Sequence, residues 1–125
     1  MATILVDSDV FIRIFKGDDA LEEQVLSPNA AVNTLIYLEL IQGATKSRAE
    51  IQEIEEYLLQ FEVVHLDKNI CTQTIRLVRQ YGNSHNLRLA DAFIAATALE
   101  NSLELFTYNV KDFEFISGLK LSGVA

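Results

Sequence analysis

The chain has 125 residues, of which half are hydrophobic and only one is proline, a composition that suits one domain with a sizeable core and argues against long disordered segments. The formal net charge is −8, which excludes a protein that coats nucleic acid non-specifically, since such proteins are basic. An acidic chain is still compatible with a nuclease whose carboxylates hold a divalent metal ion, because the ion reverses the local field.

Apolar runs of strand length alternate with helical patterns along the chain. Strands are expected at residues 4–6, 30–32, 62–66 and 103–107, with a weak strand near 120–124. Helices are expected at residues 8–15, 19–26, 35–42, 47–60, 68–81 and 89–99. The alternation predicts an α/β fold of three layers, with helices on both faces of a central, mostly parallel sheet, in a single domain over residues 1–125.

Local signals predict where several of these elements begin and end. Asp18 and Asp67 are expected to be the N-caps of the second and fifth helices, and Gly43 is expected to close the third. Residues 28–29 are expected to form a turn. The apolar stripe of the fifth helix is expected to include Ile75, which would face the core.

Nothing in the sequence indicates a membrane segment or a disulfide framework. No apolar run reaches the roughly 20 residues that would span a bilayer, and residues 1–6 lack the basic start of a signal peptide. Cys71 is the only cysteine, which fits a reducing cytoplasm. We therefore expect a cytoplasmic protein that does not engage a membrane.

Asp91 lies in a stretch, residues 89–99, that is otherwise almost free of charge and is typical of a buried helix. At helical spacing it shares a face with Ile94 and Ala95. A carboxylate against an apolar core costs several kcal/mol unless a cation, a metal ion or hydrogen-bond donors compensate it. The only basic side chain beside it in the sequence is Arg88, one turn earlier.

Other acids occupy comparable positions. Asp7 and Asp9 directly follow the first strand, Glu39 is the only charge in its helix, and Asp112 follows the strand at 103–107. In parallel α/β folds ligands bind at the carboxyl ends of strands, near the point where the strand order reverses. Carboxylates gathered there repel one another unless they share divalent cations, and oxygen-only ligand sets favour Mg²⁺ or Mn²⁺ over zinc. The metal ligands predicted at this edge are Asp7, Glu39, Asp91 and Asp112, with Asp9 either a further ligand or a helix cap.

Mg²⁺ held by carboxylates suits attack on a phosphodiester, because the metal lowers the pKa of a bound water and neutralises charge on the phosphate. The sequence contains no Ser-His-Asp or Cys-His arrangement and no Gly-rich phosphate loop. The supporting residues expected around the acids are Ser8, Thr107 and Asn109. The candidate RNA contacts are Arg13, Lys16, Arg88 and Lys111.

Four segments, in order, resemble the motifs of PIN-domain nucleases: residues 4–10, Glu39 with the residues that follow it, residues 89–98 and residues 107–113. The resemblance is closest to the VapC-type toxins of bacterial toxin–antitoxin pairs. It implies a Mg²⁺- or Mn²⁺-dependent endoribonuclease that leaves a 5′-phosphate and a 3′-hydroxyl. It also implies a homodimer and a small antitoxin whose C-terminal segment occupies the active-site groove. Asp9 stands where the family often has asparagine, and Tyr108 where a basic or small polar residue is frequent.

Three other functions fit parts of the sequence. In a receiver domain of a signalling relay, Asp67 would accept the phosphoryl group, but the Lys-Pro pair typical of receivers is missing. In a haloacid-dehalogenase-like phosphatase, Asp7 would be the nucleophile, but Phe11 stands where threonine or valine is expected. A binding module with a dead site would not need the intact set of acids.

Overall fold

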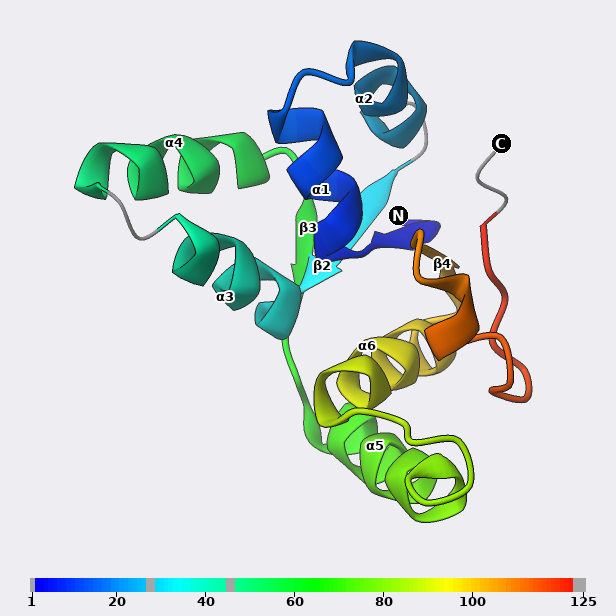
Figure 1. The fold of residues 1–125 in the computed structure, drawn as a ribbon. Coiled ribbons are helices and arrows are strands. Elements are labelled where there is room, and N and C mark those ends of the chain that lie inside the picture. The colour runs from blue at the N-terminus through cyan, green and yellow to red at the C-terminus, as the bar shows by residue number, and fades with distance from the viewer. Residues whose placement is uncertain (1, 27–28, 45–46, 123–125) are drawn as a thin grey trace.

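The computed structural model describes residues 2–26, 29–44 and 47–122, built on a parallel sheet of four strands in the order β3-β2-β1-β4 (Figure 1). The strands are β1 (Ile4–Val6), β2 (Ala30–Asn33), β3 (Glu62–Val64) and β4 (Glu104–Phe106). The weak strand expected near 120–124 is reduced to one bridge, in which Leu121 pairs in parallel with Leu105, and residues 123–124 lie outside the described part of the chain. The predicted α/β fold with a parallel sheet is confirmed.

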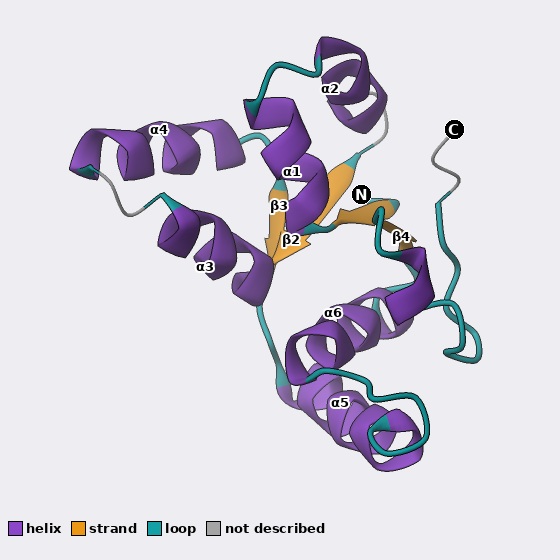
Figure 2. Cartoon of the chain, in the orientation of Figure 1, coloured by secondary structure: helices purple, strands orange, loops and turns teal. Residues whose placement is uncertain are grey.

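Helices flank this sheet on both sides (Figure 2). They are α1 (Ser8–Phe15), α2 (Asp19–Leu26), α3 (Thr34–Gly43), α4 (Arg48–Leu58), α5 (Lys68–Tyr81) and α6 (Leu89–Glu100), and a 3₁₀ turn, η1 (Val110–Asp112), follows β4. α5 and α6 pack against each other on one side of the sheet, and α1 and α2 lie on the other (Figure 1). Among the described residues no helix is both long and apolar enough to cross a membrane.

The predicted helix caps form hydrogen bonds. Asp18 Oδ1 accepts from the Leu21 N–H at 3.1 Å, and Asp67 Oδ1 accepts from the Ile70 N–H at 2.9 Å. Gly43 is the last residue of α3 rather than the residue that follows it. The turn expected at residues 28–29 includes position 28, which lies outside the described residues.

The expectation that Ile75 faces the core is wrong, because its side chain is 62% exposed. The buried face of α5 instead includes Thr74 and Leu77. Thr74 can be buried because its hydroxyl donates to the Ile70 carbonyl at 2.8 Å, which satisfies the polar group.

The topology places the carboxyl ends of β1 and β4 side by side at the switch point of the sheet. β1 pairs with β2 on one side and with β4 on the other, and Val6 is in register with Phe106. Both residues are almost fully buried, which fixes the two strand ends in the core. The residues that directly follow them, Asp7 and Thr107, therefore meet at one edge.

Candidate active site

Asp7 is held in a fixed orientation at the start of α1. Its side chain is only 5% exposed, and its Oδ1 accepts from the Ser8 N–H at 2.8 Å. Thr107 Oγ1 donates to Asp7 Oδ2 at 2.9 Å, and the Asn109 N–H donates to Thr107 Oγ1 at 3.1 Å. Burial, followed by the charge of Asp9, raises the pKa of Asp7 to about 6, although the Thr107 and Ser8 hydrogen bonds lower it.

Asp9 lies in the first turn of the same helix, and only one of its two carboxylate oxygens has a hydrogen-bond partner among the described residues. Its Oδ2 accepts from the Tyr108 N–H at 3.0 Å, which ties α1 to the segment that follows β4. Its Oδ1 is buried and accepts no hydrogen bond from the described residues. Burial raises the pKa of this carboxyl above its ordinary value. Asp9 is therefore not the N-cap of α1, a role that Asp7 fills.

Glu39 approaches the same edge from α3. Its Oε1 is buried and, within the described part of the chain, has no hydrogen-bond partner. Burial and, second, the charge of Asp7 raise the pKa of Glu39. A buried carboxylate oxygen that accepts no hydrogen bond from the protein favours a cation or a proton beside it, because its lost hydration is otherwise not offset.

Asp91 completes the acidic cluster from α6, and we use this name for Asp7, Asp9, Glu39, Asp91 and Asp112 together. Burial raises the pKa of Asp91 to about 6, and the charges of Asp112, Glu39 and Asp9 add to the increase. The charge of Arg88 partly offsets them.

Asp112 itself is exposed, in η1. Every member of the acidic cluster thus interacts electrostatically with at least one other member. Among the described residues, however, no three Asp, Glu, His or Cys side chains converge on a common point suited to a metal ion. The structure brings the predicted acids into one electrostatic neighbourhood without assembling a closed ligand cage.

The four predicted basic residues lie in different surroundings. The guanidinium of Arg13 is 4.3 Å from the centroid of the Tyr108 ring, a cation–π contact. Arg88 is the N-cap residue of α6, with no side-chain capping bond, and its charge reaches Asp91. Lys111 is exposed in η1, and Lys16 lines a groove beside Glu39.

This groove, of about 640 Å³, lies between α1, α3 and α4. Its wall is largely apolar and includes Ile12 and Phe15, which are 48% and 42% exposed. Its lining also includes Glu39, a member of the acidic cluster, and Ser8, the residue that follows Asp7. The groove therefore joins an exposed apolar surface to the carboxylates.

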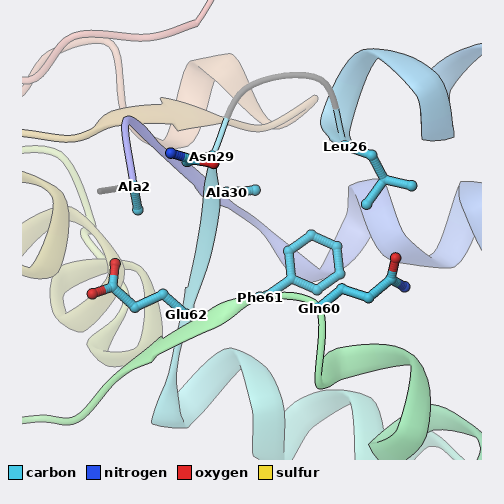
Figure 3. A pocket seen from close by; sticks show the side chains of 7 residues that line it. All are labelled: Ala2, Leu26, Asn29, Ala30, Gln60, Phe61 and Glu62. Atoms are coloured by element: carbon cyan, nitrogen blue, oxygen red, sulfur yellow. The ribbon is translucent and has the colours of Figure 1, made fainter.

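A smaller cavity, of about 330 Å³, lies at the opposite, amino edge of the sheet (Figure 3). Its lining contains Gln60 and Phe61, which precede β3, and a single carboxylate, Glu62, which is the first residue of β3. It holds none of the predicted site residues. The carboxyl edge of the sheet, where two buried carboxylate oxygens accept no hydrogen bond from the described residues, is the better candidate for the active site.

Asn33 is a functional candidate that sequence reasoning missed. It is fully buried at the end of β2, where its Oδ1 accepts from the Ile36 N–H at 2.8 Å and caps α3. Its Nδ2 donates to Thr97 Oγ1 in α6 at 3.1 Å. The sequence feature that could have revealed Asn33 is a single amide side chain at the end of an otherwise apolar buried strand.

Comparison with known proteins gives a consistent set of relatives. The family model of the PIN domain matches residues 4–118. The chain is 35% identical over 122 residues to ribonuclease VapC10 of Mycobacterium tuberculosis, covering 94% of this chain and 90% of that protein. It is 33% identical to ribonuclease VapC1 of Methanocaldococcus jannaschii, covering 94% and 85%.

Solved structures with the same fold are also similar to the chain. A toxin–antitoxin complex from Klebsiella pneumoniae aligns with a TM-score of 0.80 at 29% identity, covering 94% of this chain and 95% of that one. DNA-bound VapBC from Salmonella typhimurium aligns with a TM-score of 0.87 at 22% identity, covering 98% of each chain. At that identity the second match bears on the fold alone.

Proposed function

Because the chain belongs to the PIN-domain family, which includes the VapC ribonucleases, we propose that it is an endoribonuclease and the toxin of a toxin–antitoxin pair. We propose further that residues 1–125 form one nuclease domain and that it acts in the cytoplasm. The PIN-domain match over residues 4–118 argues against the receiver and phosphatase alternatives. Asp67, the phosphoacceptor of the receiver alternative, caps α5.

We propose that the acidic cluster holds a divalent cation, Mg²⁺ or Mn²⁺, because all of its donors are carboxylate oxygens. The observation that carries this assignment is a pair of buried carboxylate oxygens, Asp9 Oδ1 and Glu39 Oε1, that accept no hydrogen bond within the described residues. The ion would be held by Asp7, Glu39 and Asp91, with Asp9 and Asp112 as further ligands. When bound, it would supply a water of lowered pKa and neutralise charge on the phosphate.

The protein's own residues prepare this site. Thr107 donates to one oxygen of Asp7 and Ser8 donates to the other, so the carboxylate has a single orientation. Asn109 fixes the direction of the Thr107 hydroxyl, because its N–H occupies a lone pair on Oγ1. Burial and the neighbouring carboxylates raise the pKa of Asp7 and of Asp91 to about 6, so their ionised forms are costly in the folded protein, and a bound cation would offset that cost.

We propose that the basic side chains around the acidic cluster bind the RNA strand. Arg13, Lys16, Arg88 and Lys111 would contact phosphates, since Arg and Lys supply most of the contacts to nucleic-acid backbones. Arg13 is the best positioned of them, because its stacking on Tyr108 places it beside the residue whose N–H holds Asp9.

We also propose a small antitoxin as the protein partner and a homodimer as the assembly. The groove between α1, α3 and α4 supports an antitoxin site, because an exposed apolar surface leads to the acidic cluster. An amphipathic segment with a basic residue at one end would cover the apolar wall and neutralise Glu39. Such a segment would exclude RNA from the carboxylates.

Sequencing of RNA ends after inducible expression tests the proposed function. Cells expressing the wild type should accumulate new 5′-phosphate ends at defined sites and should stop growing. The matched control is Asp7→Asn, which conserves shape and helix capping but removes the charge. Growth arrest without new RNA ends, or equal cleavage by Asp7→Asn, would refute the proposal.

A further inference from the structure

A hydrogen-bonded bridge joins α3 to α6. Asn33 Nδ2 donates to Thr97 Oγ1 at 3.1 Å, and Asn33 Oδ1 accepts from the Ile36 N–H at 2.8 Å in the first turn of α3. Thr97 Oγ1 in turn donates to the Phe93 carbonyl, one turn earlier in α6, at 2.8 Å. Both side chains of the bridge have no solvent exposure.

The bridge permits only one arrangement of its donors. The single hydrogen of the Thr97 hydroxyl is committed to Phe93, so its oxygen must accept from the amide of Asn33. The amide oxygen of Asn33 is committed to capping α3. If α3 slid along α6, a buried donor would lose its partner, and such a loss is costly.

The two bridged helices carry two of the proposed metal ligands. Glu39 follows the cap by less than two turns of α3, and Asp91 precedes Thr97 by less than two turns of α6. The carboxylates are near enough for the charge of Glu39 to raise the pKa of Asp91. Their separation therefore depends on how α3 and α6 are fixed relative to each other.

We propose that Asn33 and Thr97 are positioning residues that set the separation of Glu39 and Asp91 and thereby the affinity of the site for a divalent cation. The inference rests on the proposed metal-dependent function. It adds two residues that touch neither the ion nor the RNA. Groups that hydrogen-bond to metal ligands commonly change metal affinity by 10- to 100-fold when they are removed. Asn33 and Thr97 act on the ligands through α3 and α6 rather than by direct contact, so we expect an effect at about the lower end of that range.

The structure offers a matched control on another helix. Thr74 in α5 is 3% exposed, and its hydroxyl donates to the Ile70 carbonyl at 2.8 Å, the same internal bond that Thr97 makes to Phe93. Thr74 lacks the bridge to Asn33 and lies outside the acidic cluster. A change from threonine to valine thus removes the same local bond at both positions and removes the bridge only at Thr97.

The experiment is calorimetric titration of the full chain with Mn²⁺ alone, without RNA. Thr97→Val should bind Mn²⁺ about tenfold more weakly than the wild type. Thr97→Ser, which restores the hydroxyl, and Thr74→Val should stay within about twofold. Thermal unfolding of all three, followed by circular dichroism, reports any general loss of stability, which a merely structural role would produce without a change in Mn²⁺ affinity.

A second variant keeps the test decisive if Thr97→Val does not fold. Asn33→Ser retains a good N-cap for α3 but has no amide to reach Thr97, so it should weaken Mn²⁺ binding to the same degree. The double variant should be no weaker than either single variant, because both remove one bridge. Wild-type affinity in Asn33→Ser or Thr97→Val would overturn the inference. Failure of the wild type to bind Mn²⁺ would instead overturn the proposed function on which it rests.

Discussion

Replacing Asp7 with asparagine should stabilise the protein at neutral pH while it abolishes activity. The pKa of Asp7 rises from 3.8 to about 6 on folding. At about 1.4 kcal/mol per tenfold change in proton affinity, the ionised side chain costs the folded state about 3 kcal/mol. The introduced asparagine would remain a good helix cap but would no longer accept the Thr107 hydrogen bond, a loss of about 1 kcal/mol. The net gain expected without added metal is therefore about 2 kcal/mol.

The gain depends on pH in a direction that follows from the pKa. Because the folded protein holds the proton on Asp7 more tightly than the unfolded chain does, the cost is absent below pH 3.8 and complete above about pH 6. At about pH 8 the variant should be more stable by about 2 kcal/mol, and at about pH 5 by less than about 1 kcal/mol. The ionisation of Asp7 should therefore make the wild type less stable as the pH rises from about 5 to about 8.

Urea unfolding of both proteins in the presence of EDTA, at about pH 5 and about pH 8, measures these differences. A repeat with Mn²⁺ in place of EDTA should stabilise the wild type and leave the variant unchanged, because only the wild type offers the full ligand set. A variant that is less stable than the wild type at both pH values would refute the reasoning. An advantage that is the same at both would show that it does not come from ionisation of Asp7.

Further predictions concern the rest of the site. Asp91→Asn should reduce the rate of RNA cleavage by more than about 100-fold, while circular dichroism shows an unchanged fold. A rate near that of the wild type would mean that Asp91 is not a metal ligand. Thr107→Val should raise the pKa of Asp7 in EDTA, measured by carboxyl-carbon NMR, because its hydrogen bond lowers that pKa; an unchanged pKa would contradict this. Arg13→Gln and Tyr108→Leu should each raise KM for RNA several-fold, and the double variant should be no worse than Arg13→Gln alone, since the ring acts through the guanidinium. Additive effects would mean that the two side chains bind RNA separately.

Local patterns in the sequence were sufficient to predict the helices and strands of the fold. Period and capping residues located the helices, and the N-caps at Asp18 and Asp67 form the expected bonds. The prediction for Ile75 failed because Ile75 does not share the helical face of Ile70, Thr74 and Leu77. It follows Ile70 by five residues, which is about 140° around the helix at 3.6 residues per turn, so its side chain points away from the core.

The site itself was only partly accessible from sequence. Charge in an apolar setting was enough to select Glu39 and Asp91, because an ionised group is expensive there. The partners of the acids depend on strand order: the Tyr108 N–H reaches Asp9 only because β4 lies beside β1. The bridge from Asn33 depends likewise on where α6 packs, which no local pattern contains.

We propose that a divalent cation held by Asp7, Glu39 and Asp91 enables this chain to cleave RNA. The most direct test is cleavage of a defined RNA by the purified chain across a Mn²⁺ titration, with Glu39→Gln as the matched variant. Cleavage should be absent in EDTA and should increase with Mn²⁺ until it saturates. The products should carry 5′-phosphate ends, and the variant should keep at most a few per cent of the activity. Cleavage that persists in EDTA, or that is undiminished in Glu39→Gln, would contradict this proposal.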